Sequence, residues 1–159
     1  MTLAYVGLGA NLGDSRGTVS TVMHELEQLP ASAVTGRSAL YRSAPLGVGP
    51  QADFINAVVR VATELGAEML LDELQAIEQR HGRARPYSGA PRTLDLDLLL
   101  YGDTALSTPR LSIPHPRMHE RAFVLRPLLD LDPAISIPGK GPGSRLLAAC
   151  SMQTIEPLD

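Results

Sequence analysis

The sequence predicts an α+β fold in which helices pack on an antiparallel sheet, with the ferredoxin-like element order β-α-β-β-α-β. Three observations predict it. Four extended apolar segments are punctuated by Gly and Pro, two other segments repeat their apolar residues at helical spacing, and the order of these segments matches that arrangement. The 159 residues fit one domain of ordinary size, so we expect a single domain over residues 1–159.

The first half of the chain supplies most of these elements. Asp14 or Ser15 is placed to cap the first helix, and Pro30 to end it. We expect both helices on one face of the sheet, with the first and fourth strands near its centre. The predicted elements are strands over 2–10, 34–42 and 53–63, a helix with apolar positions from Val19 to Leu29, and a helix over 66–81.

The second half begins with a polar loop over 82–91, whose Gly and Pro content suits a lid. A fourth strand over 92–101 follows it. Pro116 suits the first turn of a helix over 117–126, because proline is tolerated there. The last predicted elements are a short strand over 135–137 and a short helix over 145–151.

The composition excludes several classes of protein. A hydrophobic content of 44% and a charged content of 19% are inconsistent with disorder. No apolar run approaches the ~20 residues that cross a bilayer, and no secretion signal is visible. A net charge of −3 disfavours general nucleic-acid binding. We therefore expect a cytoplasmic monomer without nucleic-acid or membrane partners, in which the single cysteine, Cys150, is buried.

Asp95 and Asp97 are the most informative residues. Side chains alternate along a strand, so both carboxylates share one face, with Cβ atoms about 6–7 Å apart. Alternating Asp and Leu also suits an ordinary half-exposed strand, and that interpretation comes first if the strand is considered alone. The surrounding charge favours a functional site instead, because residues 80–126 hold eight arginines but only four acidic residues.

Carboxylate oxygens bind Mg²⁺, and arginine forks bind phosphate oxygens. The combination favours metal-assisted phosphoryl or nucleotidyl transfer. Two other patterns carry less weight. Gly7, Gly9 and Gly13 miss the spacing of the known phosphate loops and suit close backbone packing. His115 and His119 have zinc-like spacing, but the prolines beside His115 oppose a helix there. Glu78 is expected to be solvated, although its position also allows it to line a site.

Four blocks of the sequence resemble one family. The segment Gly-Ala-Pro-Arg-Thr-Leu-Asp-Leu-Asp-Leu-Leu-Leu-Tyr over 89–101 resembles the signature of the 6-hydroxymethyl-7,8-dihydropterin pyrophosphokinases of folate biosynthesis. Similar blocks occupy 5–13, 40–47 with 53–57, and 113–125, in the order of that family.

The resemblance implies transfer of pyrophosphate from ATP, a co-substrate, to the hydroxymethyl group of a reduced pterin. It implies that Asp95 and Asp97 hold two Mg²⁺ ions, and that Asp95 also contacts the substrate. The implied triphosphate contacts are Arg85, Arg92, His115 and Arg121. The first three of these form the catalytic set together with Asp95 and Asp97. Further nucleotide contacts are Gln75, Glu78, Leu98, Arg110 and Ser112. The implied pterin pocket comprises Ser43, Pro45, Leu46, Phe54, Asn56 and Phe123.

The sequence departs from the family at a few positions. Gly89 stands where some members carry a tryptophan, and Pro116 and Phe54 each replace a tyrosine. The alternative function is a non-catalytic ferredoxin-like module that binds a small ligand or RNA. An aromatic content of 4% argues against an RNA-binding sheet, and a small-ligand module has no need of paired aspartates among arginines.

Overall fold

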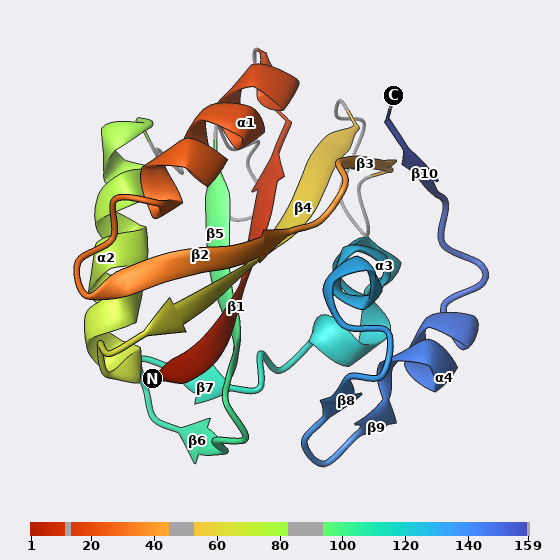
Figure 1. Cartoon of the computed structure of the whole chain (residues 1–159). Coiled ribbons are helices and arrows are strands. Elements are labelled where there is room, and N and C mark those ends of the chain that lie inside the picture. The colour runs from red at the N-terminus through yellow and green to blue at the C-terminus, as the bar shows by residue number, and fades with distance from the viewer. Residues whose placement is uncertain (12–13, 45–52, 83–93, 159) are drawn as a thin grey trace.

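The computed structural model describes residues 1–158 except 12–13, 45–52 and 83–93. Among these residues a six-stranded antiparallel sheet carries helices on both faces (Figure 1). In chain order the elements are β1 (Thr2–Ala10), α1 (Ser15–Leu26), β2 (Ser32–Arg37), β3 (Tyr41–Ser43), β4 (Phe54–Thr63), α2 (Ala67–Arg80), β5 (Asp95–Tyr101), β6 (Leu106–Ser107), β7 (Ser112–Ile113), the 3-10 helix η1 (Met118–Glu120), α3 (Ala122–Leu131), β8 (Ser136–Ile137), β9 (Gly141–Pro142), α4 (Gly143–Ala148) and β10 (Ile155–Pro157).

The predicted fold class is confirmed, but the place of one strand was wrong. The sheet runs β10-β3-β4-β1-β5, and β2 pairs with the far half of β4. The aspartate strand β5 therefore ends the described sheet instead of lying near its centre. Its outer side faces the segment after β7, where the His115 N–H donates to the Leu99 carbonyl at 2.9 Å.

The expectation that the first two helices lie on one face is confirmed, but a further helix covers the other face. Helices α1 and α2 cover one face, where apolar residues of β1, β4 and β5 form the larger core. Helix α3 covers the other face and builds a second core with Tyr5, Val58, Leu99 and Leu100 (Figure 1). Cys150 lies in this second core and is 7% exposed, as expected of a small apolar residue. Its burial raises the pKa of the thiol, and the nearby Glu120 carboxylate raises it further.

Local signals located the start of α1 and both ends of α2 to within one residue. The Asp14 carboxylate accepts a hydrogen bond from the Gly17 N–H at 3.0 Å and caps α1, as predicted. The predicted strand over 34–42 is instead two strands, β2 and β3, which pair with different halves of β4. The helix predicted over 117–126 begins only at Ala122, because the extended backbone of Arg121 (φ −120°, ψ 110°) separates it from η1. Pro116 accordingly lies outside the helix.

Candidate active site

The two aspartates lie on the α3 face of β5. Asp95 and Asp97 are both half-buried, whereas Leu94, Leu96 and Leu98 between and beside them are buried in the opposite core. The shared face predicted from alternation is therefore present. Two carboxylates on one face provide hard oxygen donors, which suit Mg²⁺.

Glycines of the neighbouring strand stand beside these carboxylates. In β1, Gly9 stands opposite Asp95 and Gly7 opposite Asp97. A Cβ on Gly9 would lie 3.1 Å from Nδ2 of Asn56, the β4 residue on its other side. The row Asp95–Gly9–Asn56 therefore has polar side chains at both ends and a gap between them. The close packing predicted for these glycines is present at Gly7, where a Cβ would lie 3.3 Å from the Leu99 side chain.

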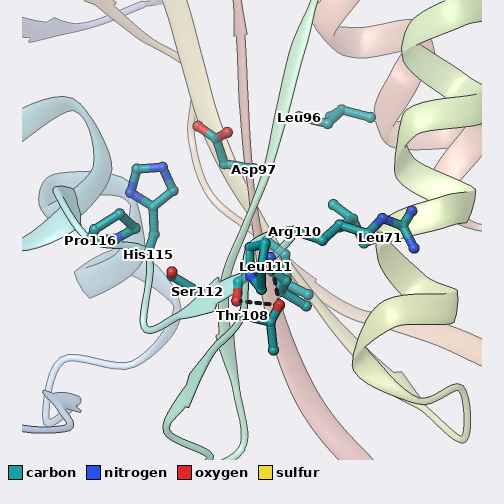
Figure 2. A pocket seen from close by; sticks show the side chains of 11 residues that line it. Leu71, Leu96, Asp97, Thr108, Arg110, Leu111, Ser112, His115 and Pro116 are labelled. Carbon is teal, nitrogen blue, oxygen red and sulfur yellow. Dashed lines mark hydrogen bonds between the residues drawn. The ribbon is translucent and has the colours of Figure 1, made fainter.

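A pocket of about 230 Å³ opens beside Asp97, at the edge of β5 (Figure 2). It lies between α2 and the chain that runs through β7 to His115. Figure 2 shows Asp97 and His115 to one side, and Arg110 with Leu71 to the other. The lining residues are Leu71, Leu96, Asp97, Leu98, Thr108, Pro109, Arg110, Leu111, Ser112, His115 and Pro116.

Five of these lining residues were predicted from the resemblance as metal or nucleotide contacts: Asp97, Leu98, Arg110, Ser112 and His115. Sequence reasoning missed Thr108 and Leu111 and assigned Leu71 only to a helix stripe. Thr108 and Leu111 form a tight turn, in which the Thr108 hydroxyl donates to the Leu111 carbonyl and accepts from its N–H. The Pro-Arg pair inside that turn is the one local signal that could have located it.

Arg110 and Gln75 lie together at the rim of this pocket. The Arg110 guanidinium donates to Oε1 of Gln75 at 3.3 Å and forms an ion pair with Asp72 of the same helix. The Arg110 and Asp72 side chains are 42% and 59% exposed, so this pair contributes little to stability. It does hold the Arg110 side chain against α2, along the pocket.

The surroundings of His115 favour the neutral form of its imidazole. Its pKa is lowered by burial and by the positive charge of Arg121, and less by Arg117, while Asp95 acts in the opposite direction. Nδ1 accepts a hydrogen bond from the Arg117 N–H at 3.2 Å. In the neutral ring the proton must therefore sit on Nε2, which makes His115 a hydrogen-bond donor toward the site.

Glu78 is 2% exposed, so the expectation of a solvated residue was wrong. Its Oε2 accepts the Leu96 N–H at 2.8 Å. Because β5 has no strand on that side in the described sheet, this bond satisfies a backbone donor at the strand edge. Glu78 thus connects the C-terminal turn of α2 to the aspartate strand.

The predicted pterin residues that the structure describes gather on the same face as the aspartates. The Ser43 hydroxyl donates to Oδ1 of Asn56 at 2.7 Å, and Phe54 pairs with Ser43 in the register of β3 and β4. Phe54 and Phe123 are half-buried, so neither is wholly a core residue. The Arg121 guanidinium lies 5.5 Å from the centre of the Phe123 ring. A predicted phosphate contact and a predicted pterin contact are therefore neighbours.

Four predicted site residues, Pro45, Leu46, Arg85 and Arg92, lie outside the described residues, as does the predicted lid over 82–91, Gly89 included, apart from Gly82. Within the described part of the chain, no three His, Cys, Asp or Glu side chains cluster as a metal site. His119 contacts Glu120 at 3.4 Å. No helix in that part is long and apolar enough to span a bilayer.

The chain resembles known proteins over most of its length. The sequence profile of the 7,8-dihydro-6-hydroxymethylpterin-pyrophosphokinase family (HPPK) matches residues 5–133. The 2-amino-4-hydroxy-6-hydroxymethyldihydropteridine pyrophosphokinase of Pseudomonas aeruginosa is 46% identical over 154 residues, which cover 97% of this chain and 95% of that protein. The protein of the same name from Haemophilus influenzae is 41% identical, covering 87% of this chain and 86% of its own length.

Solved structures agree on the fold. A crystal structure of an HPPK-DHPS protein in complex with substrates superposes with a TM-score of 0.76 at 12% identity, covering 93% of this chain. The Plasmodium falciparum HPPK-DHPS structure with pteroate gives a TM-score of 0.74 at 14% identity, covering 94% of this chain. This chain spans only 43% and 42% of those two longer chains. On the profile match and the identity to its curated relatives, the chain belongs to the 7,8-dihydro-6-hydroxymethylpterin-pyrophosphokinase family.

Proposed function

We propose that this chain catalyses the Mg²⁺-dependent transfer of pyrophosphate from ATP to the hydroxymethyl group of 6-hydroxymethyl-7,8-dihydropterin. The products are AMP and the dihydropterin pyrophosphate, in a step of folate biosynthesis. Family membership supports the reaction class. The observation that carries the proposal is the meeting of Asp97, Arg110, Ser112 and His115 in one pocket, next to the open surface at Gly9.

The pocket supports a nucleotide site. Its volume of about 230 Å³ is too small for a whole nucleoside triphosphate and suits the base and ribose. Leucine side chains offer apolar contact to a base, and Arg110 offers a charged donor. The phosphates would then extend toward Asp97 and His115, the polar side of the pocket in Figure 2.

The charged residues around that path support phosphate binding. Asp95 and Asp97 would hold the Mg²⁺ ions, which when bound neutralise phosphate charge and polarise the attacked phosphorus. His115 donates through Nε2 and adds no positive charge while neutral. Arg121 contributes a fixed positive charge and a planar set of donors. Arg85 and Arg92 complete this set in the proposal.

The pterin would lie on the α3 face, where Gly9 leaves space. The hydrogen-bonded pair Ser43 and Asn56 offers donors and acceptors to the edge of the ring, while Phe54 and Phe123 offer stacking surfaces. Pro45 and Leu46 belong to the same proposed pocket. Because Gly9 separates Asn56 from Asp95, the ring and the metal-bound phosphates would be neighbours.

The proposal is tested by product analysis. The chain is mixed with ATP, Mg²⁺ and the hydroxymethyl dihydropterin, and nucleotides are separated by chromatography. We expect AMP in equal amount to the pterin pyrophosphate. ADP as the nucleotide product, or no pterin-dependent turnover, would contradict the proposal.

A matched pair of variants tests the metal residues. Asp97→Asn should lower kcat at least ~10²-fold, because the amide cannot supply the charged ligand that the metal requires. Asp103→Asn makes the same change at an exposed turn after the same strand, and should retain full activity. Equal activities of the two variants would exclude Asp97 as a metal ligand.

A further inference from the structure

The C-terminal segment, residues 153–157, lies beyond the family match, which ends at residue 133. It contacts both β3 and the junction between η1 and α3. Strand β10 pairs with β3, and Ile155 stands opposite Ser43. Two residues earlier, Gln153 reaches the junction between η1 and α3. The segment thus connects the strand of a proposed pterin contact with the segment that carries Arg121 and Phe123.

The Gln153 carboxamide makes two hydrogen bonds to consecutive peptide groups. Its amide nitrogen Nε2 donates to the Glu120 carbonyl at 2.6 Å, and its Oε1 accepts from the Ala122 N–H at 2.9 Å. These two peptide groups flank the Cα of Arg121. Because peptide groups are planar, fixing both of them fixes the φ and ψ angles of Arg121, here −120° and 110°.

The backbone of Arg121 needs this support. No side chain of the N-cap residue itself bonds the first turn of α3, so the Ala122 N–H is one of the orphan donors of the helix start. Gln153 satisfies that donor from a distant segment. The glutamine is itself anchored, since its N–H donates to the carbonyl of the buried Cys150 at 3.0 Å.

From this fixed backbone the Arg121 side chain reaches the ring of Phe123, a proposed pterin contact. Its guanidinium lies over the Phe123 ring, and its charge contributes to the lowered pKa of His115, which places it near that imidazole. A change of φ or ψ at Arg121 would therefore move a charged group relative to both neighbours. An error of about 1 Å in such a group is enough to slow a reaction substantially.

We propose that Gln153 is a positioning residue, which aims Arg121 at the triphosphate by clamping the two peptide groups on either side of it. This inference rests on the proposed function, in which Arg121 contacts ATP. It assigns a role in the reaction to a residue that contacts neither substrate.

Steady-state kinetics of Gln153→Ala test the inference. Loss of both hydrogen bonds should raise the KM for ATP and lower kcat, so that kcat/KM for ATP falls about tenfold. The KM for the pterin should stay within about twofold. Gln28→Ala makes the same change at an exposed position near the end of α1, and should match the unmodified chain.

A double-mutant cycle separates positioning from simple support of the fold. If Gln153 acts through Arg121, then adding Gln153→Ala to Arg121→Ala should cost less than about twofold further. A purely structural role predicts the same loss in both backgrounds, together with an equal rise in both KM values. The inference would be overturned by the same loss in both backgrounds, and also by an equal rise in the KM values for ATP and the pterin.

Gln153→Glu covers the case in which the alanine variant fails to fold. Its carboxylate still accepts from the Ala122 N–H but cannot donate to the Glu120 carbonyl. We therefore expect a folded chain with the same fall in kcat/KM for ATP. Unchanged kcat/KM for ATP in this variant would overturn the inference while leaving the proposed function standing. An unmodified chain that forms no AMP would instead overturn both.

Discussion

At the scale of single residues, the candidate site depends as much on missing side chains as on present ones. Gly9 leaves the sheet surface open between Asp95 and Asn56, and the nearest atom to a Cβ there is the Asn56 amide nitrogen. The Asn56 side chain is also held by Ser43. A single methyl group at Gly9 would therefore act directly on a proposed pterin contact.

Gly9→Ala should weaken pterin binding about tenfold, because the Cβ at 3.1 Å displaces the Asn56 amide from its hydrogen bonds. Gly7→Ala is the matched control in the same strand. Its Cβ would meet the ends of the flexible Leu99 side chain at 3.3 Å, so pterin affinity should change little. Titration calorimetry with the pterin and a non-hydrolysable ATP analogue measures both. Equal affinities would exclude Asn56 as a pterin contact.

His115 gives a pH-dependent prediction. Burial, then Arg121, lowers its pKa in the folded chain below the ordinary value of 6.5. Below that value the unfolded chain binds more protons, so the stabilisation present above about pH 6.5 is lost as the pH falls. Urea unfolding should show a smaller loss of stability for His115→Gln than for the unmodified chain between about pH 7.5 and pH 5.

The matched control is His24→Gln, since the His24 side chain is 72% exposed. Its loss of stability with falling pH should parallel that of the unmodified chain. If the stability of His115→Gln also falls in parallel with that of the unmodified chain, the pKa of His115 is not lowered in the folded chain.

At the scale of elements, the site lies where an edge strand meets a helix and a returning segment. The outer side of β5 is met by Glu78 of α2 at Leu96 and by the His115 backbone at Leu99. Opposite Leu99 the register of β1 shifts, between Tyr5 and Val6. After this irregularity Leu99 and Leu100 both enter the α3-side core, which closes the aspartate face at one end.

Glu78→Ala should lower the free energy of unfolding by about 1–3 kcal/mol, because the buried Leu96 N–H loses its acceptor. Glu78→Gln keeps an acceptor oxygen at that position and should lose less. Gln79→Ala, at the exposed neighbouring position, is the control and should be near neutral. Chemical denaturation of the three variants provides the measurement. An order in which Gln79→Ala costs as much as Glu78→Ala would contradict this role.

At the scale of the whole molecule, one sheet serves two cores. Leu74 of α2 belongs to one core and Leu128 of α3 to the other, and both are 0% exposed. The Arg60 guanidinium also connects the layers, because it donates to the Leu131 carbonyl at the end of α3 and to the Thr35 hydroxyl of β2. We propose on this basis that residues 1–159 form one domain.

A single domain predicts one cooperative transition. Leu74→Ala and Leu128→Ala should each lower the free energy of unfolding by about 2–5 kcal/mol, because each leaves a cavity in its core. In both variants, far-UV circular dichroism and tyrosine fluorescence should report the same midpoint. A variant whose two midpoints separate would show that the cores unfold independently and would contradict the proposal.

The sequence by itself determined the features that depend on near neighbours. The alternation of β5 placed Asp95 and Asp97 on one face, the apolar stripes marked α1 and α2, and Asp14 marked a cap. Period two and period 3.6 are local properties of the backbone, so a short window of sequence contains them. The arginine-rich surroundings and the family blocks added the chemistry.

Only the tertiary structure decided what depends on distant partners. It put β5 at the sheet edge, buried Glu78 against it, divided the helices between two faces, and brought the Gln153 carboxamide to the peptide groups around Arg121. The physical reason is that hydrophobic periodicity says which face of an element is buried but not which partner buries it. Pairing across long stretches of chain is set by the packing of the whole molecule.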